Sequence, residues 1–165
     1  MVVVCAAAGA AEFSLTETNL ALMTDKLTPA TELPELPGRA SLVGTLLERM
    51  EIVITEVTAE RAVGRMPVAG NTQPMGLLHG GASVVLAESL GSIAAAIHAG
   101  PGRTAVGTEI NATHHRSARS GYAHAVATAI PLGGTSATYE IVVSDDDGAR
   151  LCTARLSCRL LEIRS

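Results

Sequence analysis

The stretch "GGASVVLAESLGSIAAAIHAG", residues 80–100, decides the fold of this chain. Its apolar and small side chains fall on every side of a helical wheel, so the pattern predicts a long buried helix from Gly80 to about His98. Glu88 is the only Asp, Glu, Lys or Arg between residues 66 and 102. Burying a carboxylate without a partner costs on the order of several kcal/mol, so Glu88 either bonds a neighbouring backbone group or arginine, or it has a chemical role.

The segments around this helix read as strands and turns. Residues 51–68, "EIVITEVTAERAVGRMPV", predict two strands around a turn near Ala59–Glu60. A short amphipathic helix precedes them, with a stripe of Leu42, Leu46 and Met50. After "AGPG", which stops the long helix, four strand patterns follow, at residues 103–118, 121–132, 135–145 and 149–163. This order predicts an α+β domain in which a five- to six-stranded antiparallel sheet wraps a long central helix.

Alternating alanines mark one strand in particular. In "GYAHAVATAI", residues 121–130, every second residue from Ala123 to Ala129 is alanine. Since side chains alternate between the two faces of a strand, all four alanines share one face. A face without bulk lets another element approach closely, and we expect the long helix to pack there.

The chain of 165 residues is most simply one folded domain. Residues 1–40 are interpreted as an N-terminal extension and linker, because "TPATELPELPGRA" carries three prolines and a glycine. A helix within residues 14–27 is plausible there, since Ser14 can cap it with Glu17 three residues on. We assign residues 41–165 to the domain itself.

The composition argues against several classes of protein. The net charge is −4 and only three aromatic residues occur, so neither a basic surface nor base-stacking rings favour nucleic acid binding. Three cysteines without paired spacing do not resemble a disulfide framework, and Cys152 and Cys158 share one strand face. The N-terminus lacks the positive charges of a signal peptide, and no apolar run of about 20 residues predicts a membrane span. We therefore expect a cytoplasmic protein without membrane or nucleic acid partners.

The start of the long helix is the first candidate for a functional site. "HGG" at residues 79–81 places amides at a helix N-terminus, where carbonyl oxygens and anions bind, and glycines let a ligand approach closely. Gln73 and His79 lie just before these amides. A carbonyl-polarising group together with Glu88 suits attack on an acyl group. The alternatives are a tight turn at Gly80–Gly81, a loop histidine and an exposed glutamine.

The distance between the two candidate groups has a consequence for assembly. Eight residues separate Gly80 from Glu88, which is about 12 Å along a helix. One substrate carbonyl can hardly contact both groups within one chain. The spacing predicts a site shared between two chains, with two such sites in a two-fold dimer.

Two motifs resemble a known family. "NTQPMGLLHGGASVVLAESLGS" (residues 71–92) and "VGTEINATHHR" (residues 106–116) resemble hotdog-fold acyl-CoA thioesterases of the phenylacetate-degradation type, whose enterobactin- and menaquinone-pathway branches are the most alike. The resemblance covers about residues 45–160. It implies a long helix wrapped by an antiparallel sheet, homodimers with shared active sites that double into homotetramers, and hydrolysis of acyl-CoA or acyl-carrier-protein thioesters without metal or other cofactor.

The resemblance also implies roles for individual residues. Glu88 matches the catalytic carboxylate, acting as general base or nucleophile, and Gly80 matches the amide donor to the thioester oxygen. Gln73 and His79 match the helpers beside Gly80, and Ser92 matches a residue that orients water or the carboxylate. The positions that match substrate and coenzyme contacts, with His114 near the acyl group, are Gly107, His114, His115, Arg116, Ser117, Pro131, Gly133, Gly134, Thr135 and Ser136.

The chain departs from the family pattern at one turn. Relatives often carry an arginine after the glycine in "PLGGTS" (residues 131–136), where this chain has Gly134. Phosphate contacts then move to another arginine, such as Arg116 or Arg119, or weaken. His114 and His115 are adjacent, so a strand points them to opposite faces, and we expect no metal site.

Aryl or other bulky acyl groups are the expected substrates. Two alternatives remain open on the sequence. One is an enoyl-CoA hydratase or dehydratase of the same fold, and the other is a non-catalytic acyl-CoA-binding protein.

Overall fold

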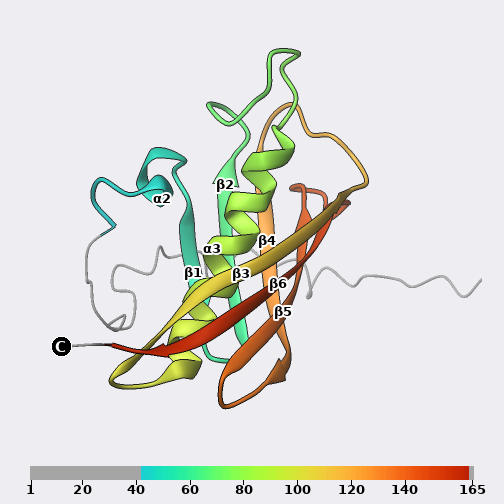
Figure 1. The fold of residues 1–165 in the computed structure, drawn as a ribbon. Coiled ribbons are helices and arrows are strands. Elements are labelled where there is room, and N and C mark those ends of the chain that lie inside the picture. Colours follow the sequence, from blue (N-terminus) through green and yellow to red (C-terminus); the bar gives the residue numbers. More distant parts are fainter. Residues whose placement is uncertain (1–41, 164–165) are drawn as a thin grey trace, which may run out of the picture.

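The computed structural model describes residues 42–163 (Figure 1). Its elements are α2 (Leu46–Arg49), β1 (Val53–Val57), β2 (Arg61–Pro67), α3 (Gly80–Ala99), β3 (Arg103–His114), β4 (Tyr122–Leu132), β5 (Ser136–Ser144) and β6 (Arg150–Glu162). This order confirms the predicted α+β arrangement of a short helix, two strands, a long helix and four strands. The linker and the helix expected within residues 1–40 lie outside the described residues.

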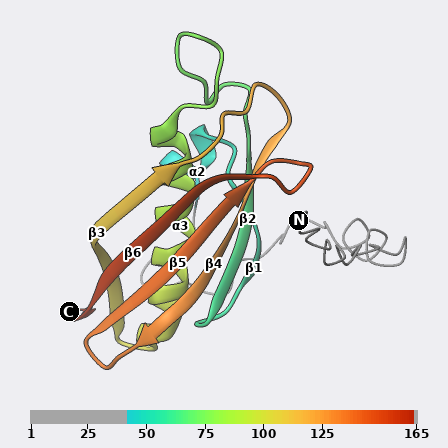
Figure 2. The same ribbon diagram turned by 90° about the vertical axis from the view of Figure 1, so that its right-hand side faces the viewer.

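The sheet is antiparallel throughout and has six strands in the order β1-β2-β4-β5-β6-β3. After α3 the chain crosses to the far edge of the sheet and enters it as β3. Figures 1 and 2 show that the strands curve across one side of α3, so the sheet partly encloses the helix. β3 is an edge strand that pairs with β6 over nearly its whole length.

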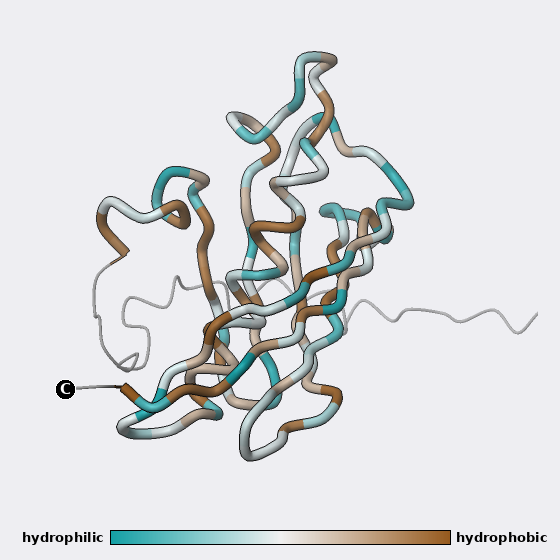
Figure 3. The backbone as a smooth tube through the Cα atoms, in the orientation of Figure 1, coloured by the Kyte–Doolittle hydropathy of each residue, from teal (hydrophilic) through white to brown (hydrophobic). Residues whose placement is uncertain are grey.

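The core lies between α3 and the concave face of the sheet. On α3, Leu86 and Leu90 are fully buried. Each strand contributes the side chains at every second position, which face the helix. Ala123, Ala125 and Ala127 are each 0% exposed, and Ala129 packs against the same core. The prediction that the alanine face of this strand meets the helix is confirmed. Figure 3 shows hydrophobic residues recurring along the helix and the strands.

The prediction that α3 is buried on all sides is wrong for one face. Glu88 is exposed, and Val84, Val85 and Ser92 are only partly buried. The reason is that the sheet covers one side of the helix and leaves the other open within a single chain. Among the described residues, α3 alone is long and apolar enough to cross a membrane, with a mean hydropathy of 1.5; its packing against the sheet accounts for that composition.

The short helix α2 also differs from the prediction. It forms a single turn, capped by Thr45, whose side chain accepts from the Glu48 amide. Leu46 is 51% exposed, whereas Leu47 and Met50 pack against the core. Gly44 has a positive φ of 76°, which breaks the helix before Leu46, so the expected stripe of Leu42, Leu46 and Met50 does not form.

Candidate active site

A hydrogen-bonded loop positions the N-terminus of α3. The Gln73 amide donates to the Leu77 carbonyl over 2.8 Å, which closes the loop on itself. The His79 amide donates to the Asn71 carbonyl over 2.9 Å. The Asn71 side chain in turn donates to the carbonyls of Met50 and Pro67. The first turn of α3 is therefore tied to the end of β2 and to the segment after α2.

His79 acts as the N-cap of α3. Its Nδ1 accepts a hydrogen bond from the Gly81 amide over 2.9 Å, which satisfies one of the free donors at the helix start. The sequence suggested that the amides of "HGG" are available to a ligand. In the structure the Gly81 amide is already occupied by His79. In the part of the chain that the structure describes, the Gly80 amide has no acceptor, and it is the donor that remains open.

His114 lies directly over Gly80. A Cβ atom built on Gly80 would stand 2.9 Å from the Nε2 atom of His114. Only glycine fits at this position without moving the imidazole, so the glycine is required by its neighbour rather than by its own backbone angles. The last residue of β3 and the first residue of α3 therefore meet, and the His114 ring lies beside the open amide.

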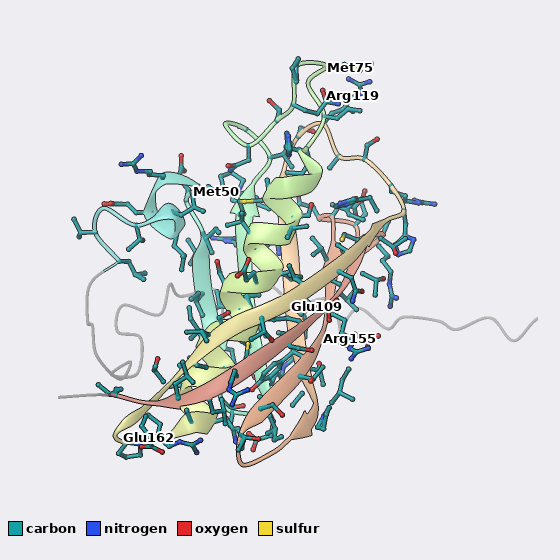
Figure 4. All side chains as sticks on the ribbon, viewed as in Figure 1. Met50, Met75, Glu109, Arg119, Arg155 and Glu162 are labelled. Carbon is teal, nitrogen blue, oxygen red and sulfur yellow. The ribbon has the colours of Figure 1, made fainter. Side chains whose placement is uncertain are left out.

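The two loops next to the start of α3 carry Gln73 and the exposed residues Met75 and Arg119. The Gln73 Oε1 atom accepts from the Met75 amide, and within residues 42–163 the side-chain NH₂ group, which can donate, has no acceptor. The Arg119 guanidinium donates to the Met75 carbonyl over 3.5 Å, and the Leu78 amide donates to Ala118. Figure 4 shows Met75 and Arg119 side by side, where the loop before α3 meets the loop after β3.

Glu88 lies about two turns further along α3, against β3. A Cβ atom built on Gly107 would stand 3.1 Å from the Glu88 Oε1 atom, so the carboxylate rests on bare backbone. The register of β3 against β6 shifts between Gly107 and Glu109. Thr108 is the extra residue, and its hydroxyl donates to the Ser157 carbonyl over 3.0 Å. This β-bulge, a feature often found beside active sites, lies next to the carboxylate.

Ser92 and Cys158 lie behind Glu88. Cys158 faces inward on β6, is 1% exposed and pairs across the sheet with Gly107. Burial raises the pKa of the Cys158 thiol, a side-chain hydrogen bond with Ser92 acts in the opposite direction, and the charge of Glu88 raises it further. The sequence offered no sign of this contact, because it depends on the register of β6.

The residues expected to contact coenzyme do not gather in one place. The turn of Gly133 and Gly134 lies at the C-terminal end of α3, where His98 Nε2 contacts the Gly133 carbonyl at 3.0 Å and Arg103 donates to Gly134 over 2.8 Å. His114 lies at the opposite end of a helix of 20 residues, about 30 Å long.

Not every amide of this turn is open to a phosphate. The Gly133 amide donates to the Ser136 carbonyl over 2.8 Å, so this amide is already occupied. The Thr135 carbonyl accepts from the Leu160 amide. Pro131 is exposed at the end of β4. Arg103, which sequence reasoning did not single out, contacts this turn at Gly134.

The two adjacent histidines face opposite sides of the sheet, as predicted. His114 packs on Gly80 beneath the sheet, whereas His115 Nε2 contacts the Thr153 hydroxyl at 2.9 Å on the outer face. Arg116 and Ser117 follow in the exposed loop. Among residues 42–163, no group of three or more His, Cys, Asp or Glu side chains is placed to hold a metal ion.

Comparisons with known proteins identify the family of this chain. Residues 75–152 match the model of the thioesterase superfamily. The proofreading thioesterase EntH of Cronobacter sakazakii is 46% identical over 123 residues, which cover 74% of this chain and 90% of that protein.

Solved structures give the same result. Thioesterase HI1161 of Haemophilus influenzae matches with a TM-score of 0.71 and 34% identity, over 74% of this chain and 87% of that one. A variant of thioesterase PA1618 of Pseudomonas aeruginosa matches with a TM-score of 0.68 and 41% identity, over 73% of this chain and 88% of that one. The chain therefore belongs to the thioesterase superfamily and is a thioester hydrolase with the hotdog fold.

Proposed function

We propose that this protein hydrolyses acyl-CoA thioesters, with aryl or other bulky acyl groups, to the free acid and coenzyme A. The observation that carries the proposal is the arrangement on α3. The Gly80 amide is open at the helix N-terminus beside His114, and the exposed Glu88 carboxylate follows about two turns later. One group can polarise a carbonyl, and the other can activate water.

Gly80 is the proposed donor to the thioester oxygen. An amide at the start of a helix carries the positive end of the helix dipole, and such donors stabilise the negative charge that develops on an attacked carbonyl oxygen. His79 keeps the neighbouring Gly81 amide occupied, so the geometry presents one donor rather than several. Gln73 offers its NH₂ group from the adjacent loop. The reaction proposed here uses no cofactor besides the coenzyme A of the substrate.

Glu88 is the proposed base or nucleophile. As a base it takes a proton from water, the water oxygen bonds the carbonyl carbon, and the carbon–sulfur bond breaks to release coenzyme A as the thiol. As a nucleophile it forms an anhydride that water then hydrolyses. Labelling with ¹⁸O-water in a single turnover distinguishes the two routes, because only the anhydride route puts solvent oxygen into the Glu88 carboxylate.

A second copy of the chain is the proposed partner. β3 has 12 residues, most of them exposed, and its outer edge has no neighbouring strand among the described residues. An exposed edge of this length is a template for pairing with another chain. Pairing of β3 with its copy would bring Gly80 of one subunit near Glu88 of the partner subunit. We propose a homodimer with two shared sites that doubles into a homotetramer.

The proposed thioester of coenzyme A or of a carrier protein rests on charge. Arg116 and Arg119 lie in the loop beside Gly80, where they can attract the phosphates of coenzyme A or of a carrier protein's prosthetic group. Arg103 and the Gly134 turn lie at the other end of α3 and would serve a site completed by the partner. The proposed place of the reaction is the cytoplasm, where the free thiols of Cys152 and Cys158 would stay reduced.

The test is a panel of CoA esters followed with a thiol reagent that detects released coenzyme A. The panel contains benzoyl-CoA, hexanoyl-CoA and crotonyl-CoA. The proposal expects thiol release with benzoyl-CoA at the highest kcat/KM, and no hydration of crotonyl-CoA. Release of thiol from none of the esters, or hydration of crotonyl-CoA without thiol release, would overturn it.

A further inference from the structure

Two side chains near the end of α3 bind the carbonyls of the turn between β4 and β5. The His98 Nε2 atom lies 3.0 Å from the Gly133 carbonyl oxygen. Because a carbonyl oxygen can only accept, this ring nitrogen carries the proton. The Arg103 guanidinium donates to the Gly134 carbonyl over 2.8 Å. Figures 1 and 2 show the turn and the end of α3 at the same end of the molecule, so both carbonyls are directed toward that end of the helix.

These two carbonyls determine where the next amides point. The described residues contain no cis peptide bond, so the C=O and N–H groups of each peptide unit point in opposite directions. The amides that share a peptide unit with the Gly133 and Gly134 carbonyls are those of Gly134 and Thr135, which therefore point away from α3. Neither amide has an acceptor within residues 42–163. The Gly133 amide differs, because the Ser136 carbonyl accepts from it over 2.8 Å.

An arginine of the adjoining strand is unpaired beside this turn. Arg159 of β6 pairs with Ser136 of β5, and both side chains are exposed on the outer face, where each alternates with buried residues of its strand. In the part of the chain that the structure describes, the Arg159 side chain makes no hydrogen bond or ion pair. Arg103 is different, since its Nε atom lies 3.2 Å from a Glu162 carboxylate oxygen.

The groups on the solvent side of the turn are suited to an anion. Outward amides next to one another attract negative charge, and a guanidinium binds phosphate oxygens strongly. The hydroxyls of Thr135 and Ser136 are further donors. A Cβ atom built on Gly134 would meet no other atom within 4 Å, so a bulky group can approach this backbone.

We propose that the Gly134 and Thr135 amides, together with Arg159, bind a phosphate group of coenzyme A. His98 and Arg103 are positioning residues, which keep these amides outward and do not contact the phosphate. The inference rests on the proposed function, since it assigns groups that bind the coenzyme part of the same substrate. The family resemblance pointed to the turn alone, whereas the two positioning residues and the arginine of β6 follow from the contacts described above.

The first test needs no turnover. Protein labelled with ¹⁵N-glycine is titrated with coenzyme A and, separately, with pantetheine, which carries no phosphate. We expect the amide signal of Gly134 to shift with coenzyme A only, and the signal of the occupied Gly133 amide to stay in place. Gly134→Ala assigns the signal by its loss. A Gly134 signal that does not move with coenzyme A, or that moves equally with pantetheine, would overturn the proposal.

The same titration tests the positioning role. Arg103→Ala leaves the Gly134 carbonyl without its donor, so most of the shift of the Gly134 amide signal should be lost. Arg103→Lys, which keeps a donor and a positive charge, should retain most of that shift. The full shift in Arg103→Ala would contradict the role of Arg103.

Calorimetry with coenzyme A compares two arginines of β6. Arg159→Ala should raise Kd about tenfold, because one charge-assisted contact with phosphate is lost. Arg155→Ala is the matched control. Arg155 is exposed on the same face of the strand, but it lies opposite Glu140 rather than beside the turn, so its loss should hardly change Kd. Equal changes in the two variants would exclude a specific contact with Arg159.

Failure of the proposed function has a different signature. A wild type that shows the expected Gly134 shift but releases no thiol from any ester would refute hydrolysis and leave the phosphate site in place. A wild type that releases thiol from benzoyl-CoA but shows no Gly134 shift would refute the phosphate site and leave hydrolysis in place. Thermal unfolding of every variant separates the loss of a contact from the loss of the fold.

Discussion

The first turn of α3 and its middle present two kinds of chemistry on one helix. At the first turn the proposed functional group is the Gly80 backbone amide, and its availability depends on the absence of a side chain at Gly80 and on the cap supplied by His79. In the middle the proposed functional group is the Glu88 carboxylate, and its surroundings come from β3 and β6. The difference shows that the Gly80 half of the proposed site is set mostly by local sequence, whereas the Glu88 half depends on strand register.

This difference predicts how substitutions would impair each half of the proposed site. A backbone donor cannot be removed by substitution, so the first half is damaged by displacement. A side chain can be removed while its shape is kept, so the second half can lose its chemistry without losing its structure.

The largest effect is expected for Glu88→Gln. The amide has the shape of the carboxylate but cannot accept a proton from water, so kcat should fall about a thousandfold. Because Glu88 is exposed in the single chain, the free energy of unfolding should hardly change. Thiol release from benzoyl-CoA and urea unfolding measure the two quantities. A Glu88→Gln variant with full kcat would remove Glu88 from the mechanism.

A smaller loss is expected for Gly80→Ala. The new methyl group would stand 2.9 Å from His114 Nε2, so the imidazole or the helix start must shift, and kcat should fall about thirtyfold through the displaced donor. His114→Ala makes room for the methyl group. The double variant should therefore be less impaired than the product of the two single effects. A purely multiplicative result in the same kinetic assay would argue against this steric account.

His79→Ala tests the cap. Loss of the hydrogen bond from the Gly81 amide to Nδ1 should lower the free energy of unfolding by about 1 kcal/mol, measured with urea. His79→Asn is the matched control, since asparagine is a strong N-cap and should retain most of that stability. If His79→Asn is stable and yet loses most of its kcat, His79 contacts the substrate in addition to capping the helix.

The smallest effect is expected for Asp146→Asn, on the outer face of the sheet. Asp146 accepts from the His124 ring over 2.7 Å and from the Tyr122 amide over 3.0 Å. The hydrogen bond with His124 is the main cause that lowers the pKa of Asp146. Both side chains are well exposed, so Asp146→Asn should cost at most about 0.5 kcal/mol at neutral pH and leave kcat unchanged.

The sign of the pH dependence follows from the lowered pKa of Asp146. A carboxyl that is more acidic when folded adds stability above its unfolded pKa, and this stability is lost as the pH falls through the folded value. Urea unfolding of the wild type and of Asp146→Asn should therefore differ at neutral pH and converge in acid. A difference that grows as the pH falls would contradict the assignment.

Local patterns predicted most of the fold. The apolar run ended by "AGPG" gave the bounds of α3, and alternation in "GYAHAVATAI" identified the sheet face that packs on the helix, because both depend on side-chain period alone. The start of α3 was also readable, since glycines and a capping residue act within a few positions of one another. The hydrogen bond that occupies the Gly81 amide could not be predicted, because the sequence pattern does not fix the orientation of the His79 ring.

Features that depend on distant partners could not be predicted. Hydrophobicity showed that α3 is apolar but not which side the sheet leaves open, so Glu88 was expected to be buried. The bulge at Thr108 and the contact of Arg103 with Gly134 each join segments far apart in the chain. These contacts follow from strand register, which a single sequence does not display.

The central claim is that the Gly80 half and the Glu88 half of each site come from two chains. Co-expression of Gly80→Ala and Glu88→Gln with different affinity tags isolates mixed oligomers. Each mixed dimer then holds one intact site and one doubly damaged site, so the account predicts about half of the wild-type kcat per dimer. A mixed oligomer no more active than the average of its two parents would contradict it.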